Sequence, residues 1–162
     1  MNNDIPGETV PAAFGEWIRE YYGGILLLKL GRYEDAKRRL VDGLKLALGQ
    51  GNDRTIMRLG AAVAYLAGGD NSDAECELNE IGDFGDSHSR HLTQILHLHL
   101  AVARNDQQKV KEIAGYFSSQ VGLEQAFSSV VDALLRNDLI EAQRGEYNLL
   151  LAATPDSVST AA

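Results

Sequence analysis

Histidine is the residue type in this chain that is best suited to chemistry, and all four histidines lie in one short segment: His88, His91, His97 and His99. Imidazole nitrogen is a common zinc ligand. In a helix His88 and His91 would share a face, whereas His97 and His99, two residues apart, would point to opposite faces. No acidic residue or cysteine stands at a helical spacing that would complete a site. We therefore expect these histidines to pack between helices or line a groove, and we expect neither a metal site nor another cofactor.

The remaining reactive residue types give little support for catalysis. Cys76 is the only cysteine, so the chain cannot form an internal disulfide and suits a reducing compartment. It lies between Glu75 and Glu77, whereas a reactive thiol needs a basic neighbour. The sequence also lacks the Gly-x-Ser-x-Gly motif of hydrolases and a glycine-rich phosphate loop ahead of a lysine. We expect that the protein is not an enzyme.

Composition and charge narrow the class of partner. The 162 residues carry a net charge of −8, which argues against nucleic acid, because phosphate binding needs a basic face. No apolar run is long enough to span a membrane. The first residues, MNNDIPGETVP, lack the basic and apolar regions of a secretory signal. These features predict a cytoplasmic protein that binds neither nucleic acid nor membrane.

The elements that must position these residues are predicted to be helices. The three prolines, Pro6, Pro11 and Pro155, all lie near the ends of the chain, so the interior is free of the strongest helix breaker. We expect a flexible N-terminal arm (residues 1–11), a helical repeat domain (12–153) and a disordered tail (154–162). Apolar periodicity and turn residues predict eight helices: Ala12–Leu30, Tyr33–Leu48, Arg54–Ala67, Asp73–Ile81, one from a cap at Asp86 or Ser87 to Ala103, Gln107–Ser118, Leu123–Leu135 and Leu139–Leu151.

Four turns along the chain resemble one another. They begin Gly-Arg, Gly-Asp, Asn-Asp and Asn-Asp, and a small residue follows each turn. These small residues are Ala36, Ala74, Val110 and Ala142, at intervals of 38, 36 and 32 residues. A period of this length is typical of stacked helix pairs, in which neighbouring pairs together bury the apolar face that one pair cannot bury alone.

On these turns and small residues the chain resembles tetratricopeptide repeat (TPR) proteins over nearly its whole predicted helical part. The resemblance implies an all-α fold, a right-handed α-solenoid of about four antiparallel helix pairs arranged as a TPR-like superhelix. The first two repeats match the family pattern best. In the fourth, Glu146 stands four residues after Ala142, where the family has a large apolar residue. The family's usual first-helix aromatic and its closing proline are absent.

The resemblance also implies a concave surface lined by the first helix of each pair. The matching positions are almost all apolar, so the lysine and asparagine clamp with which some relatives grip chaperone C-termini is missing. A register shift would instead place these residues in the core. The candidate partner-binding residues are Ile18, Tyr21, Ile25, Leu28, Lys29, Ile56, Leu59, Val63, Leu66, Leu92, Ile95, His99, Val102, Phe127, Val131 and Leu134.

An open apolar groove of this kind would bind an apolar or amphipathic segment of another protein. The expected function is therefore an adaptor or chaperone-like interaction module. Residues 70–86 contain seven acidic residues and no Lys or Arg, so an acidic rim would select partners with basic flanks. Two alternatives stay open: a self-assembling scaffold, for example a homodimer joined through the apolar face, and a regulatory sensor of a peptide or small molecule.

Overall fold

The protein is all-α in the part of the chain that the computed structural model describes, residues 12–47, 52–82 and 86–153. Four of the eight expected helices begin at the predicted residue, and the fifth helix along the chain begins after Asp86, one of its two expected caps. The other three begin within two residues of the predicted start. The arm at 1–11 and the tail at 154–162 lie outside the described residues. The helices are α1 (Ala12–Lys29), α2 (Tyr33–Leu46), α3 (Asn52–Ala67), α4 (Asn71–Asn79), α5 (Ser87–Ala103), α6 (Gln107–Ser118), α7 (Gln125–Leu135) and α8 (Leu139–Ala152).

The four turns predicted to be equivalent share one backbone geometry. Gly31, Gly69, Asn105 and Asn137 each have a positive φ, between 58° and 81°, the left-handed conformation that glycine and asparagine adopt most readily. After each of them, the next residue's N–H donates to the carbonyl five residues earlier, as Arg32 does to Leu27 at 2.9 Å. This is the Schellman arrangement that ends a helix. The same device therefore closes α1, α3, α5 and α7.

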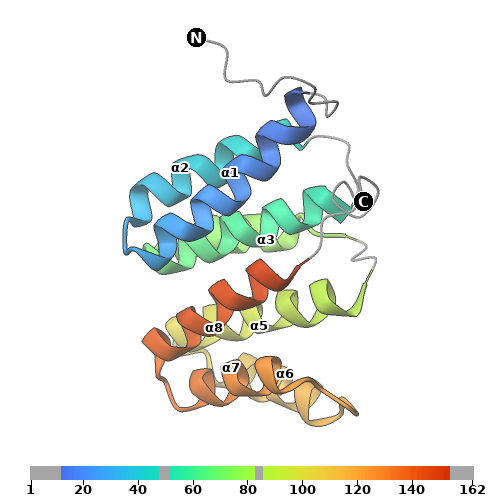
Figure 1. Ribbon diagram of the computed structural model, residues 1–162. Helices are drawn as coiled ribbons and strands as arrows, with labels where there is room; N and C mark the ends of the chain where they lie inside the picture. The colour runs from blue at the N-terminus through green and yellow to red at the C-terminus, as the bar shows by residue number, and fades with distance from the viewer. Residues whose placement is uncertain (1–11, 48–51, 83–85, 154–162) are drawn as a thin grey trace.

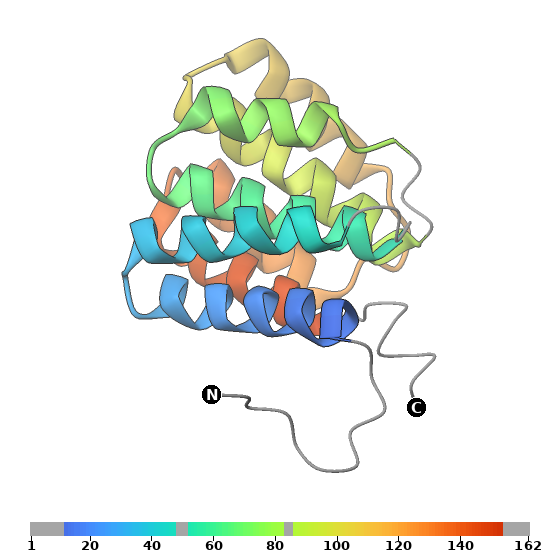
Figure 2. The same cartoon turned by 90° about the horizontal axis from the view of Figure 1, so that it is seen from above.

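The helices lie in successive tiers (Figure 1). Each turn joins two helices in contact, so α1 packs on α2, α3 on α4, α5 on α6 and α7 on α8. Contacts of α1 with α3, α3 with α5, and α5 with α7 join one pair to the next. Seen from above, the chain progresses from α1 and α2 at one edge to α6 at the other (Figure 2).

The last helix departs from a simple stack of pairs. Besides its partner α7, α8 contacts α1, α3 and α5, and in Figure 1 it lies in front of α5, below α1 and α3. The first and last helices of the described chain therefore touch. One apolar core runs through all eight described helices, and burial of that apolar surface is the main stabilising term.

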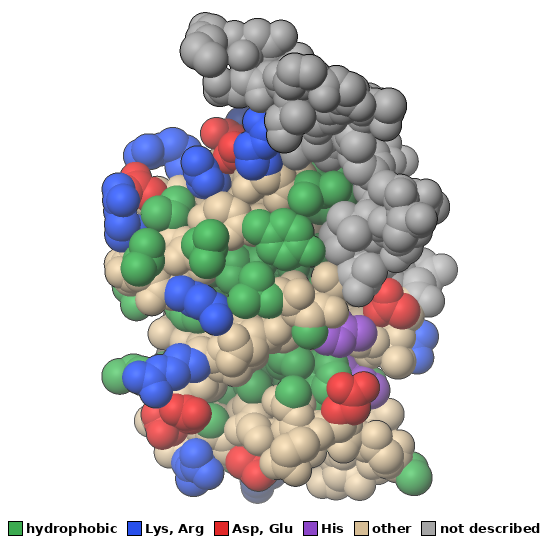
Figure 3. All heavy atoms as spheres, viewed as in Figure 1, with side chains coloured by type: hydrophobic (Ala, Val, Ile, Leu, Met, Phe, Trp, Pro, Cys, Tyr) green, Lys and Arg blue, Asp and Glu red, His purple; other side chains and the backbone are tan. Residues whose placement is uncertain are grey.

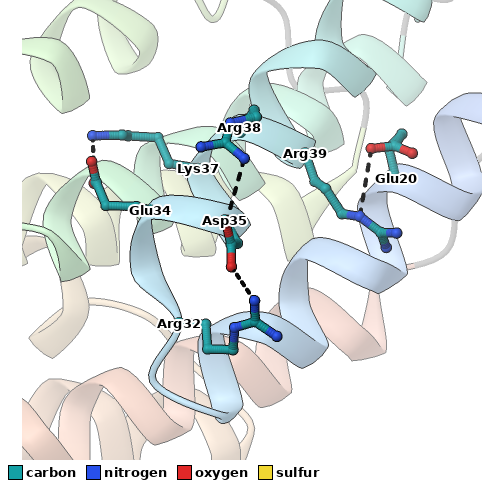
Figure 4. Close-up of polar contacts among 7 residues, drawn as sticks. All are labelled: Glu20, Arg32, Glu34, Asp35, Lys37, Arg38 and Arg39. Atoms are coloured by element: carbon teal, nitrogen blue, oxygen red, sulfur yellow. Dashed lines mark hydrogen bonds and ion pairs between the residues drawn. The ribbon is translucent and has the colours of Figure 1, made fainter.

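Two adjacent glycines let α2 approach α1 closely. A Cβ on Gly24 would lie 2.5 Å from Cγ of the buried Leu40. A Cβ on Gly23 would collide with the guanidinium of Arg39, which points from α2 toward α1 in Figure 4. Glycine weakens a helix. At these two positions it leaves room for side chains of α2, which lie directly on the surface of α1.

Candidate functional site

The residues predicted to line the concave surface lie in the core of the described structure. Ile18 and Val102 are half-buried and Lys29 is exposed. The remaining candidates are no more than 7% exposed, and α8 contacts all four helices that carry them: α1, α3, α5 and α7. These buried candidates are Tyr21, Ile25, Leu28, Ile56, Leu59, Val63, Leu66, Leu92, Ile95, His99, Phe127, Val131 and Leu134.

This burial corrects the expected open groove. Leu59 and Ile95 are 1% and 0% exposed, so an aspartate at either position would enter the core without a partner and unfold the protein rather than block a surface. Contact of these residues with another protein stays a prediction, and it would require α8 to move away.

Polar contacts fix α8 in this position. The buried hydroxyl of Tyr21 in α1 donates to the carbonyl oxygen of Leu150 at 2.6 Å. Lys29, at the end of the same helix, donates to Asn148 Oδ1 at 3.0 Å. Both contacts join residues more than a hundred positions apart. They tie the C-terminal helix to the N-terminal one.

A buried ionisable pair ties α8 to α5. Nδ1 of His99 lies 2.6 Å from Oε2 of Glu146, and the two side chains are 2% and 0% exposed. The other carboxylate oxygen of Glu146 has no hydrogen-bond partner within the described residues. Burial alone would lower the pKa of His99, but the charge of Glu146 and its hydrogen bond outweigh burial and raise that pKa. His99 is therefore protonated more readily than a buried histidine without a carboxylate partner would be.

The other histidines act as packing residues. His88 contacts the carbonyl oxygen of Leu149 at 2.9 Å, and its ring stands edge-on to Phe127. His91 packs on Phe127 as well. His97 is half-buried on a different face of α5 from His99, as the two-residue spacing predicts. Within the described ranges, no group of three or more His, Cys, Asp or Glu side chains is placed to hold a metal ion.

An open hollow between α1 and α2 is a site that the sequence did not predict. Its volume is about 530 Å³. Leu26 and Leu27 of α1 form its apolar side, and three arginines form its rim together with two aspartates. Figure 4 shows the three arginines and one of the aspartates, Asp35. The lining residues are Gly23, Leu26, Leu27, Arg32, Asp35, Arg38, Arg39 and Asp42.

The ion pairs at this rim are exposed to solvent. Asp35 is shared between Arg32 and Arg38, with the second contact at 3.4 Å. Arg39 lies 3.9 Å from Glu20 (Figure 4). The three guanidinium groups are 47–72% exposed, and exposed pairs of this kind contribute only about 0–1 kcal/mol each. The arginines can therefore exchange these partners for other carboxylates at little cost.

Apolar side chains continue from the hollow along α1. Ile18, Tyr22, Leu26 and Leu30 recur every four residues, so they follow one side of the helix. The first two are half-buried, whereas Leu26 is 57% and Leu30 is 72% exposed. In Figure 3, apolar side chains occupy the centre of the face that carries α1 and α8, and basic side chains lie on its left side. We call these four residues the α1 stripe.

The acidic stretch at 70–86 has a structural role. Three of its carboxylates form ion pairs with cations on other helices, so they hold α4 against its neighbours rather than forming an unpaired rim. Hydrogen bonds that Lys37 donates to Glu34 and Asp70 raise the pKa of Lys37 well above its usual value. Cys76, in the same stretch, is exposed. The ion pairs are Lys37–Asp70 at 3.0 Å, Arg58–Glu77 at 2.7 Å and Arg104–Glu75 at 3.0 Å.

Comparisons with known proteins identify no relative. No protein-family model matches the chain. No curated protein matches it, and no solved structure resembles it significantly. Among the described helices, none combines the length and apolar character needed to cross a membrane. The candidate site is therefore defined by the geometry of this chain alone: an arginine-rimmed hollow beside the α1 stripe.

Proposed function

We propose that this chain is a protein–protein interaction module of the adaptor or chaperone-like type, which binds an apolar or amphipathic segment of a partner protein. The observation that carries the proposal is the exposure of Leu26 and Leu30, 57% and 72%, beside a hollow of about 530 Å³. Single exposed leucines are ordinary on protein surfaces. An apolar row along one helix that continues into a hollow is a shape that a partner helix fits.

The charges around the hollow favour an acidic partner. Three arginines and two aspartates line it, and the sequence from Lys29 to Arg58 holds eight basic and four acidic residues. Arginine binds carboxylates through two parallel hydrogen bonds. The partner that fits is an amphipathic helix with an apolar face and acidic flanks. This reverses the charge expected from the sequence, because three of the seven acidic residues at 70–86 form ion pairs with other helices.

We extend the proposal to the architecture: the four helix pairs form a TPR-like, right-handed solenoid of antiparallel helices whose inner side is filled by α8. Four equivalent turns and the contacts between successive pairs support it. In such a solenoid the inner side is the usual binding surface. With α8 in place there, a partner meets the α1 stripe and the hollow first.

The test uses a fluorescent synthetic amphipathic helix with leucines on one face and glutamates on its flanks, and its counterpart with lysines. Fluorescence anisotropy should show saturable binding of the glutamate peptide that weakens with salt. Leu26→Asp should reduce its affinity at least tenfold, because a buried carboxylate opposes both the apolar contact and the acidic flanks. Val121→Asp is the matched control, since Val121 is fully exposed in the α6–α7 connection.

Circular dichroism should show that both variants keep the helicity of the parent. Equal binding by the two variants, or stronger binding of the lysine peptide, would refute the proposed surface. Concentration-dependent sedimentation of the parent chain that Leu26→Asp abolishes would instead favour self-assembly through the α1 stripe. Absence of binding by both peptides would refute the interaction module and would favour a regulatory sensor of a small molecule.

A further inference from the structure

A second, smaller pocket lies where the C-terminal end of α1 meets α8. Its volume is about 280 Å³, and it is lined by Lys29 of α1 and by Arg144, Tyr147 and Asn148 of α8. Two of these four residues are cations and none is acidic. The pocket shares no lining residue with the arginine-rimmed hollow, so the two sites can be tested separately.

The cations of this pocket have little compensating charge. Within the described chain, the only polar contact of the Lys29 side chain is its hydrogen bond to the neutral Oδ1 of Asn148, at 3.0 Å. This bond fixes the amide so that its NH₂ group is left free to donate. Arg144 reaches Glu141 at 3.5 Å, and both side chains are more than half exposed, a geometry in which an ion pair contributes little. The pocket is therefore rich in hydrogen-bond donors and positive charge.

Tyr147 adds an unpaired donor. Its side chain is buried, with 5% exposure, and its hydroxyl has no hydrogen-bond partner within the described residues. Buried hydroxyl groups normally have a partner, so this one is unusual. Burial, followed by the nearby Tyr33 and Glu146, raises the pKa of Tyr147 well above its ordinary value. The hydroxyl therefore keeps its proton, and it can donate to an acceptor that reaches it.

We propose that this pocket binds a small organic oxyanion, a carboxylate or a phosphate monoester on a compact apolar body. The oxyanion accepts hydrogen bonds from Lys29, Arg144 and the Asn148 amide, and displaces the weak contact between Arg144 and Glu141. The apolar body lies against the ring of Tyr147, and a small side-chain rotation brings the hydroxyl to the ligand. Charge-assisted bonds of this kind are the strongest hydrogen bonds in proteins. The volume excludes drug-sized ligands, which fill larger pockets.

Such a ligand would join the two ends of the described helical chain. Lys29 belongs to the first helix and Arg144 to the last, so an anion between them holds α8 against α1. A ligand that binds only the folded protein raises its unfolding temperature. Binding and stabilisation should therefore appear together.

The test is isothermal titration calorimetry of the full chain with benzoate, phenyl phosphate, inorganic phosphate and the neutral benzyl alcohol. We expect saturable binding of benzoate or phenyl phosphate, with the preferred one identifying the oxyanion, and at least tenfold weaker binding of benzyl alcohol. Lys29→Met and Arg144→Met should each weaken the preferred anion about tenfold or more. Lys111→Met is the charge-matched control, because Lys111 is exposed on α6, away from the pocket.

Tyr147→Phe gives a readout that is independent of charge. We expect the free variant to melt at or above the temperature of the parent, because an unpaired hydroxyl is removed, while its affinity for the anion falls severalfold. Unchanged affinity in Tyr147→Phe would overturn the part of the proposal that assigns the hydroxyl to the ligand. Absence of binding by all four compounds, or equal weakening by Lys29→Met and Lys111→Met, would overturn the site itself.

Discussion

The buried pair of His99 and Glu146 permits a sharp test of how α8 is held in the fold. We consider three variants: His99→Leu, Glu146→Met and the double substitution. Each single change leaves one polar or charged group in the core without its partner, which lies 2.6 Å away in the parent chain. The double change replaces both groups with apolar side chains of similar size.

The magnitudes follow from the burial of the pair. Removing one member of a buried ion pair costs about 3–5 kcal/mol, a large part of the roughly 5–15 kcal/mol that stabilises a typical domain. For a chain of this size, that loss lowers the melting temperature by about 6–20 °C. The double variant should recover most or all of the loss, because its core contains no unpaired charge. The partnerless Oε1 of Glu146 favours the replacement further.

The same pair predicts a dependence of stability on pH. The pKa of His99 is raised in the folded protein, so the folded state binds this proton more tightly than the unfolded chain, in which a histidine titrates near about 6.5. The stability that the pair contributes is therefore complete below about pH 6.5 and is lost as pH rises through the higher folded pKa.

His97 has the opposite effect. Its pKa is lowered, first by burial and then by Lys109, so the stability it contributes is complete above its unfolded value of about 6.5 and is lost as pH falls through the lower folded pKa. Both histidines contribute to the pH dependence of the parent chain. His97 is unchanged in the double variant. Subtracting the double variant's curve of stability against pH from the parent's curve therefore isolates the contribution of the His99–Glu146 pair.

Urea unfolding followed by circular dichroism at several pH values above about 6 measures both the coupling between His99 and Glu146 and the pH dependence of the stability that their pair contributes. A double variant no more stable than the less stable single variant would show that the two residues are not coupled. Parallel stability curves for the parent and the double variant would show that His99 is not the group that titrates. Either result would refute the account of α8 given above.

The helices and turns could be predicted from the sequence because their causes are local. Gly31 and Asn137 each end a helix with a positive φ, and a glycine or an asparagine after an apolar periodic run predicts that geometry. The start of α4 was predicted less accurately. The helix was expected to begin at Asp73, whereas it begins at Asn71, after Asp70, without a side-chain cap.

The burial of the candidate groove residues could not be predicted, because it depends on long-range packing. The apolar spacing of Tyr21 and Ile25 shows that they face a neighbour or a groove, but it does not say which. The contact that decides between them joins Tyr21 to Leu150, 129 residues away. One signal was present: Glu146 occupies a position where the repeat pattern has a large apolar residue. A lone carboxylate there indicates a buried partner, which the structure identifies as His99.

The arginine-rimmed hollow was missed for a related reason. Lys37, Arg38 and Arg39 read as the solvated outer side of α2, and two of the three do line a surface. The position of Arg39 at this rim depends on Gly23 of α1, which allows its guanidinium to lie across that helix. The sequence shows the glycines and the arginines but not that they meet.

Two further predictions test the packing around α1. Gly24→Ala should destabilise the protein by about 1–3 kcal/mol, because its Cβ would lie 2.5 Å from Leu40. The control Gly115→Ala, whose Cβ would meet no atom within 4 Å, should stabilise the protein by up to about 1 kcal/mol. Thermal unfolding that ranks the two variants otherwise would contradict this packing. Tyr21→Phe should cost about 1–3 kcal/mol, since it leaves the buried carbonyl of Leu150 without its donor. The loss should be largest where that donor holds α8, so amide hydrogen exchange in α8 should accelerate more than exchange in α4, which has no bond to Tyr21. Equal acceleration in both helices would mean that Tyr21 stabilises the whole core rather than the docking of the last helix.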